Sequence, residues 1–374
     1  MRRDKTTQEF VLERKTVLKV TDTTALKGAA ILSITLHNYF HRLLTNVHEN
    51  QFSFGPQRVF EFTSAVIDPR YSLQALLTFL GHFGVQIFIF LSAYGLTRKH
   101  GSKPPPWAEF VWQRLRKLYP MVLALAVGWV LLAGLPHGIT GVQRVLENHG
   151  TSLLLTILGV SNMVPGYASP AIGPWWFIPF IMQFYCIWPA LVRFDNRFGP
   201  TGLVLLAGAC VGITYFVNGM LAPYHLTALR WPLGHMPEIC LGIAAARYGF
   251  YPGMTGGMIA AVVFVVSNFY APLWLLSFPA ALVICLSLYA AGQRRISSSS
   301  FLQYVGALAM PLFLINTIVR RYVLMIASRD DTWIAGLILG FVSAGASIAA
   351  AALLMRARAV AGARQDDYQR GAWR

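Results

Sequence analysis

The sequence predicts an all-α polytopic membrane protein with about ten transmembrane helices and both termini in the cytoplasm. Three observations support this fold class. Of the 374 residues, 55% are hydrophobic and only 12% are charged, whereas soluble domains carry about twice that charged fraction. Apolar runs long enough to cross a hydrocarbon core recur along the chain. The basic residues gather in short clusters between these runs.

The apolar runs predict spans at 24–44, 73–97, 118–134, 174–192, 201–218, 230–247, 254–270, 272–291, 303–324 and 334–355. Each run shows the sustained apolar pattern of a membrane helix. A further apolar piece at 153–160 is short for a span. We expect it to form a surface or re-entrant helix in an outer loop.

The basic clusters predict the orientation of the chain. They precede the first span and recur after the even-numbered spans, and they share one side only if the piece at 153–160 does not cross. By the positive-inside rule, that side is cytoplasmic. The net charge of +16 is therefore attributed to membrane orientation, and no nucleic-acid partner is expected. Residues 1–22 are expected to form a cytoplasmic segment, 23–358 the transmembrane domain and 359–374 a cytoplasmic tail.

Four ionisable residues fall inside predicted spans, where they are costly and mark candidate functional sites. They are His37, His41, His82 and Glu238. Counting along each helix places His37, His82 and Glu238 at similar depth, together with Asn316. We favour a functional role for His37 and a structural role for His41, which lies one turn further out. For His82 and Glu238, packing and function remain equal alternatives.

A metal site is the weaker interpretation of the histidine pair. His37 and His41 are four residues apart and share a helix face, as zinc ligands often do. The sequence identifies no clear third ligand, so no metal is predicted. The four cysteines, Cys186, Cys210, Cys240 and Cys285, have no metal or pairing spacing and are expected to be inert packing residues.

Two further groups have competing interpretations. Arg114, Arg116 and Lys117 lie where the third span leaves the cytoplasm. They fit a topology signal or lipid-phosphate contacts, and equally the phosphates of a polyanion such as coenzyme A. Trp175 and Trp176 begin a helix on the outer side, and we expect a membrane-interface belt there rather than a sugar-stacking platform.

Five motifs in order resemble the acyltransferase-3 family of membrane O-acyltransferases, over almost the whole chain. LKGAAILSITLHN resembles the family's first helix, in which a basic residue is followed by a histidine about three turns later. FGVQIFIFLSAYGL resembles its second helix, RLRKLYP its Arg-x-x-Arg motif, GPWWFIPFIMQFYCIWPAL its Trp-Phe-rich helix and PLFLINTIVRR its late helix. Many relatives have His where this chain has Asn316.

The resemblance implies a ten-helix domain that moves an acyl group, usually acetyl, from cytoplasmic acyl-CoA to a hydroxyl of a glycan or lipid-linked sugar. It assigns the motif histidine to His37, its basic partner to Lys27 and the Arg-x-x-Arg pair to Arg114 and Lys117. Two departures stand out. His37 lies one place earlier than the family pattern has it, with Asn38 in the usual place. Gln86 replaces an acidic residue common among relatives.

Together these arguments predict an acetyl-CoA-dependent O-acetyltransferase of the bacterial plasma membrane. His37 would be the general base or the acyl carrier, with Glu238 or His82 orienting its ring. Lys27, Arg114, Arg116 and Lys117 would bind the CoA phosphates. Polysaccharide-assembly proteins are candidate partners. The alternatives are a transporter or flippase with a buried His/Glu proton relay and a non-catalytic membrane partner of a polysaccharide-assembly complex.

Overall fold

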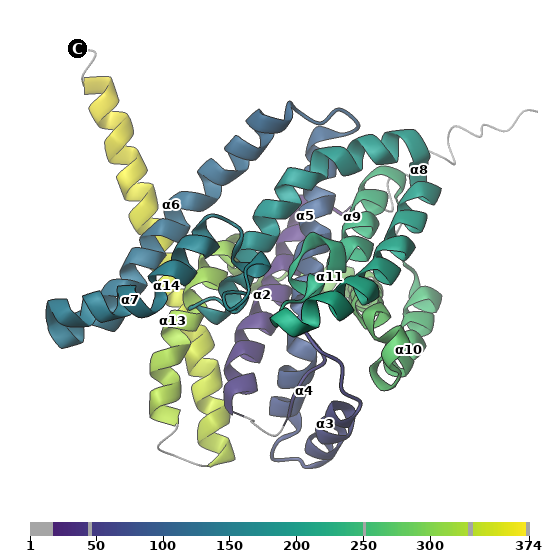
Figure 1. Ribbon diagram of the computed structural model, residues 1–374, viewed down its shortest axis with the longest axis horizontal. Helices are drawn as coiled ribbons and strands as arrows, with labels where there is room; N and C mark the ends of the chain where they lie inside the picture. The colour runs from purple at the N-terminus through teal and green to yellow at the C-terminus, as the bar shows by residue number, and fades with distance from the viewer. Residues whose placement is uncertain (1–17, 44–46, 250–251, 328–331, 372–374) are drawn as a thin grey trace, which may run out of the picture.

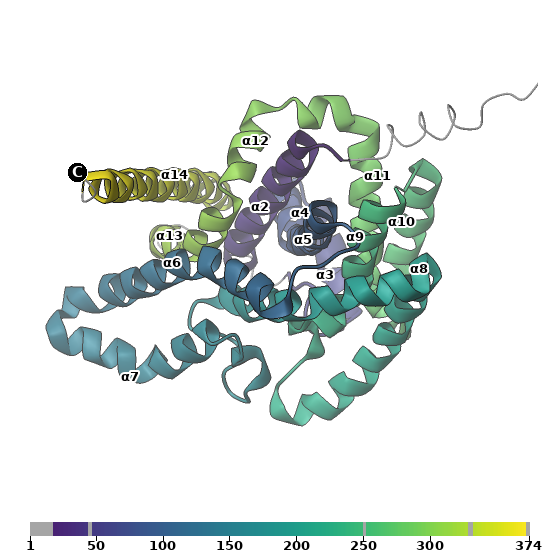
Figure 2. The same cartoon turned by 90° about the horizontal axis from the view of Figure 1, so that it is seen from above.

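The computed structural model describes residues 18–43, 47–249, 252–327 and 332–371, and within these ranges every regular element is a helix (Figures 1 and 2). Residues 1–17 of the predicted N-terminal segment and 372–374 of the predicted tail lie outside the described residues. An all-helical chain fits a membrane environment, because a helix satisfies its backbone polar groups internally.

The helices follow one another with short connections. The first half of the chain holds α2 (Val20–Leu43), α3 (Gln57–Ile67), α4 (Ser72–Leu80), α5 (Gly84–His100), α6 (Trp107–Gly134) and α7 (Gly138–Ile157). The second half holds α8 (Phe177–Leu221), α9 (Met236–Tyr248), α10 (Met254–Phe269), α11 (Ser277–Ser297), α12 (Ser300–Ala307), α13 (Ala309–Ala327) and α14 (Trp333–Gly371). Short 3-10 turns join several of them, among them η1 (Gly81–Phe83), η4 (Gly173–Trp176), η6 (Ala228–Arg230) and η7 (Pro232–His235).

Six helical stretches of the described residues are long and apolar enough to cross a membrane. They are Ser72–His100, Trp107–Ile157, Gly173–Tyr224, Ala271–Gln293, Ala309–Ile326 and Trp333–Val360. Together they make this a multi-pass membrane protein. The count of about ten spans and the cytoplasmic placement of both termini stay predictions.

Several boundaries differ from those predicted. Residues 153–157 of the apolar piece at 153–160 end α7, a 20-residue helix that lies beside α6, and residues 158–160 follow it (Figure 2). The predicted separation of 174–192 from 201–218 appears as a break inside α8, where Gly199 has φ 64° and Pro200 follows. The predicted span at 230–247 is only partly α-helical, because α9 has 13 residues and begins after η7.

Helix α2 occupies the centre of the bundle. It contacts α4, α5, α11, α12, α13 and α14, and Figure 2 shows these helices around it. At its start, the backbone N–H of Lys19 donates to the buried Asp22 carboxylate over 2.7 Å, which satisfies one of the free donors of the first turn. The Tyr289 hydroxyl of α11 donates to the same carboxylate over 2.7 Å.

Two glycines allow α2 and α12 to touch backbone to backbone. A Cβ atom at Gly28 of α2 would lie 2.0 Å from the Leu302 carbonyl oxygen, and one at Gly306 of α12 would lie 1.9 Å from the Thr24 carbonyl oxygen. Small residues permit such close packing between membrane helices. The position of α2 therefore depends on the absence of side chains at this crossing.

We expect Gly28→Ala to destabilise the protein by about 1–3 kcal/mol, because the added methyl forces α2 away from α12. The melting temperature of the detergent-purified protein measures this. Gly345→Ala in α14 is the matched control, since a Cβ there meets nothing within 4 Å. Equal melting temperatures for the two variants would contradict the close approach.

Candidate functional site

His37 lies in the buried middle of the bundle, with 5% of its surface exposed. Its Nδ1 atom is 2.8 Å from the backbone carbonyl oxygen of Thr78 in α4. A carbonyl only accepts hydrogen bonds, so the Nδ1–H of His37 donates and Nε2 carries the lone pair. The Thr78 carbonyl thus selects the tautomer in which Nε2 is the basic nitrogen.

Gly81 of η1 brings α4 and η1 up to this part of α2. A Cβ at Gly81 would lie 2.6 Å from the His37 Cβ atom and 2.9 Å from the Ser33 carbonyl oxygen. The Ser33 hydroxyl donates to the Gly81 carbonyl over 3.1 Å. The glycine that precedes His82 in the sequence therefore sets the distance between the two histidine-bearing segments.

Three histidine rings meet at this point. The His37 ring stacks on the His41 ring, with centroids 5.4 Å apart and an interplanar angle of 28°. The His82 ring lies 5.6 Å from that of His37. His82 is 1% exposed, and neither of its ring nitrogens has a hydrogen-bond partner among the described residues. The sequence predicted a similar depth for His37 and His82, and the structure adds that their rings lie side by side.

Glu49, from the segment after α2, joins this cluster. Its Oε2 atom is 2.8 Å from Nδ1 of His41. Burial alone would raise the pKa of Glu49, but the adjacent His41 imidazole and the nearby rings of His37 and His82 lower it to about 2. Glu49 is therefore an anion at neutral pH.

The same residues could hold a metal cation. The nitrogen and oxygen atoms of His37, His41 and Glu49 that could act as ligands lie within 4.8 Å of one another. Glu49, the third candidate ligand of this set, was not identified from the sequence.

The histidine cluster lines a polar cavity of about 380 Å³, which we call the histidine cavity. It lies towards the C-terminal end of α2, and loop residues 49–52 and 169–174 complete its wall. Charged members of its lining, besides the histidines, are Arg42, Glu49, Arg230 and Arg320. Its aromatic members are Phe52, Trp176 and Phe313.

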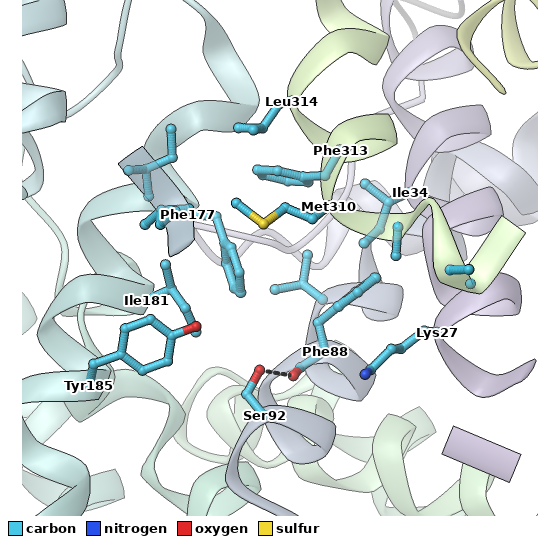
Figure 3. Close-up of a pocket in the computed structure, with 16 residues that line it drawn as sticks. Lys27, Ile34, Phe88, Ser92, Phe177, Ile181, Tyr185, Met310, Phe313 and Leu314 are labelled. Atoms are coloured by element: carbon cyan, nitrogen blue, oxygen red, sulfur yellow. Dashed lines mark hydrogen bonds between the residues drawn. The ribbon is translucent and has the colours of Figure 1, made fainter. Parts of the chain in front are cut away.

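A second cavity of about 360 Å³, the apolar cavity, lies towards the N-terminal end of α2 (Figure 3). Lys27 stands at its edge, and Phe88, Phe177, Met310 and other apolar side chains line it. Ile34, Val85 and Phe313 line both cavities. These three side chains therefore lie between the two cavities, and His37 lies one turn beyond Ile34 on the side of the histidine cavity.

The predicted phosphate-binding residues separate into two groups. Lys27 lines the apolar cavity and is half-buried. Arg114 is also half-buried, with its guanidinium 3.3 Å from Nε2 of His100 and 5.3 Å from the Phe110 ring centroid. Arg116 and Lys117 are exposed and line neither cavity.

Glu238 lies apart from the three histidines, and its predicted role in orienting His37 has no geometric support. Its carboxylate is fully buried at the start of α9, and its Oε2 atom is 3.9 Å from Nδ1 of His235. It lines neither cavity. The group that orients the His37 ring is instead the Thr78 backbone carbonyl, which accepts the hydrogen bond from Nδ1–H of His37.

Two other sequence expectations change. Trp175 and Trp176 are 0% and 8% exposed, so they are buried and do not form the predicted interface belt. The Trp175 indole N–H donates to the Leu314 carbonyl, and Trp176 lines the histidine cavity. Asn316 lies beside α2, where its side-chain oxygen accepts from the Asn38 amide over 3.3 Å.

Sequence reasoning missed the four charged residues that line the histidine cavity besides its histidines: Arg42, Glu49, Arg230 and Arg320. Arg320 lies within the predicted span 303–324, and an arginine inside a span is a signal of function by itself. Arg42 and Arg230 lie at the ends of predicted spans, where they resemble ordinary interfacial residues. Glu49 lies in a predicted outer loop, and no local pattern there distinguishes it.

The family comparison agrees with this arrangement. A model of the acyltransferase-3 family, described as an acyltransferase domain, matches residues 22–356. The chain belongs to the acyltransferase-3 family. The match confirms the resemblance and makes the protein a membrane acyltransferase. No curated protein and no solved structure gives a significant match. In this acyltransferase, both cavities and the three histidines fall inside the matched region.

A network around Asn162 fixes Arg230 at the cavity. The Asn162 side chain is fully buried, and its amide N–H group donates to the Arg230 carbonyl over 2.8 Å and to the Gln183 side chain over 3.2 Å. Gln183 donates back to Asn162 over 2.8 Å and to the Gly159 carbonyl over 3.0 Å. The Trp231 indole N–H donates to the Asn162 carbonyl over 2.9 Å.

We expect Asn162→Ala to lower stability by about 1–3 kcal/mol, because it leaves buried partners without hydrogen bonds. Thermal unfolding of the purified protein measures the loss. Asn148→Ala serves as control, since Asn148 is exposed on α7. If Asn162→Ala unfolded at the same temperature as the control variant, the Asn162 hydrogen bonds would not stabilise the segment that carries Arg230.

Proposed function

We propose that this acyltransferase moves an acyl group, typically acetyl, from cytoplasmic acyl-CoA to a hydroxyl of a glycan or lipid-linked sugar on the opposite face of a bacterial plasma membrane. The observation that carries the proposal is that Ile34, Val85 and Phe313 line both cavities, so only these side chains lie between them. His37 lines the histidine cavity one turn beyond Ile34, so a donor in the apolar cavity and an acceptor in the histidine cavity would meet at its ring once the acyl end passes these side chains.

The apolar cavity suits the acyl-pantetheine arm of the donor. Lys27 lines this cavity, and Arg114 lies near enough to its lining residue Tyr185 to act on it electrostatically. Arg116 and Lys117 lie exposed a short distance along α6. Ammonium and guanidinium groups at such a mouth would bind the CoA phosphates. Lys27 is ten residues before His37, which is on the order of 15 Å along a helix. The extended pantetheine arm covers a distance of this order.

The chemistry requires a base for the acceptor hydroxyl. In direct transfer, Nε2 of His37 takes the hydroxyl proton while the oxygen attacks the thioester carbonyl. The new C–O bond forms, the C–S bond breaks, and the proton passes to the departing CoA thiolate. In a two-step version, Nε2 attacks the thioester carbonyl and the C–S bond breaks, which releases CoA thiolate. The acceptor hydroxyl then attacks the acyl carbon, the C–N bond to the imidazole breaks, and the hydroxyl proton passes by way of Nε2 to the thiolate.

The neighbours of His37 support this role. The Thr78 carbonyl keeps the proton on Nδ1, so Nε2 is available as the base or nucleophile. His41 is held by the Glu49 carboxylate and stacks on His37. The Glu49 carboxylate lies close enough to both rings to favour positive charge that develops on His37 during the reaction. The His82 ring lies 5.6 Å from the His37 ring and lines the same cavity.

We expect His37→Ala to lower acyl transfer by about 10²–10⁴-fold, the usual contribution of a general base. Inverted membrane vesicles given acetyl-labelled CoA measure this, with label followed into glycan, lipid and protein fractions. His48→Ala is the matched control, because His48 is an exposed histidine that pairs with Glu61 and lines neither cavity.

Equal labelling by wild type and His37→Ala would overturn the assignment of the base. Absence of label from both, in membranes rich in acceptor, would favour a transporter. Transfer that is lost on chelation and restored by added Zn²⁺ would make His37, His41 and Glu49 metal ligands instead.

A further inference from the structure

The charges that line the histidine cavity are strongly unbalanced. Three arginines, Arg42, Arg230 and Arg320, line it together with three histidines, and Glu49 is the one carboxylate among its described lining residues. Glu49 already pairs with His41 at 2.8 Å. The described part of the chain therefore leaves the arginines of this cavity without a carboxylate within 4.0 Å.

Arg320 is the most deeply placed of the three cations, with 8% of its surface exposed. Its guanidinium donates to the Asn38 carbonyl, while its Nε–H has no partner among the described residues. Arg42 lies near enough to repel it electrostatically. Burying a guanidinium without a counter-charge is costly, and a bridging anion would relieve both the burial cost and the repulsion.

Arg230 approaches from η6 on another wall of the same cavity. One guanidinium nitrogen donates to the Ser169 hydroxyl over 3.2 Å, and the guanidinium lies 4.7 Å from the centroid of the Phe52 ring. Its Nε–H has no partner in the described residues. Burial lowers the pKa of Arg230, because desolvation penalises the charged form. The Asn162 network fixes this backbone, so the guanidinium is held in place.

Aromatic rings stand next to these cations. Phe52 and Trp176 both line the cavity, with ring centroids 5.2 Å apart and planes at 89°. A sugar ring packs its C–H face on such surfaces, and guanidinium groups bind carboxylate or phosphate groups in bidentate fashion. Aromatic and cationic groups in one cavity together match a sugar that carries an acidic group.

We propose that the acceptor is an acidic sugar whose carboxylate or phosphate binds between Arg230 and Arg320, which places a ring hydroxyl at His37. The identification of the bound sugar as the acceptor rests on the proposed function. The binding of an acidic sugar to the cavity is a separate property, and it can be measured without acyl transfer.

The test measures binding to the full-length purified protein by tryptophan fluorescence and thermal stabilisation. The probes are D-glucuronate for a carboxylate, D-glucose 1-phosphate for a phosphate, and neutral methyl glucoside. Arg230→Gln is the test variant, since Arg320 also supports the Asn38 backbone and its loss could unfold the site. Arg144→Gln, at an exposed arginine of α7, is the matched control. Acetyl-CoA binding is measured on every variant.

We expect an acidic probe to bind at least tenfold more tightly than methyl glucoside, and Arg230→Gln to weaken that probe by about 10–100-fold, as loss of a charged hydrogen bond does. Arg144→Gln should bind like wild type, and acetyl-CoA affinity should not change. The tighter of the two acidic probes identifies carboxylate or phosphate as the recognised group.

Acidic probes that bind no better than methyl glucoside, or that bind Arg230→Gln and Arg144→Gln equally, would overturn the proposal. Weakened acetyl-CoA binding in Arg230→Gln would assign the arginines to the donor instead. If His37→Ala retains acyl transfer while Arg230→Gln loses the acidic probe, the assignment of the base fails and the acidic-sugar site stands.

Discussion

The hydrogen bond from His37 to the Thr78 carbonyl is the interaction on which the site depends. A polar ring placed in the apolar centre of a helix bundle is costly unless its nitrogens are satisfied. Here one nitrogen is satisfied by backbone, which leaves the other available for chemistry and defines which one it is. The same contact joins α2 to α4 and brings η1, with His82, against the ring. The same hydrogen bond therefore positions α2 against α4 and determines which nitrogen of His37 carries the lone pair.

The two cavities differ in the polarity of their linings. The one next to Lys27 is lined almost entirely by apolar side chains, whereas the one beyond Ile34 is lined by histidines, arginines and a carboxylate. A flexible thioester arm has little to gain from charges, while a hydrated sugar must exchange its water for protein donors. In the proposed function, this division would bring substrates of opposite character to His37. It also explains why Ile34, Val85 and Phe313 are apolar, since they separate the two environments.

The sequence predicted the family and the helical class, because these depend on hydrophobic runs and on recognisable motifs. It could not predict contacts that join distant segments. The carboxylate beside the histidines is Glu49 from a loop, not Glu238, which lies near His235. Counting residues along a helix predicts depth, but depth carries no information about lateral position. Backbone groups such as the Thr78 carbonyl have no sequence signature, so the orienting group could not be predicted.

A cryo-electron microscopy structure with a non-hydrolysable thioether analogue of acetyl-CoA would show directly where the donor binds. We expect density for the nucleotide near Lys27 and Arg114, and for the arm along Phe88 and Phe313, ending beside Nε2 of His37. An arm that enters past Arg230, or an acyl end placed beside Glu238, would contradict the central claim that donor and acceptor meet at His37 from opposite ends.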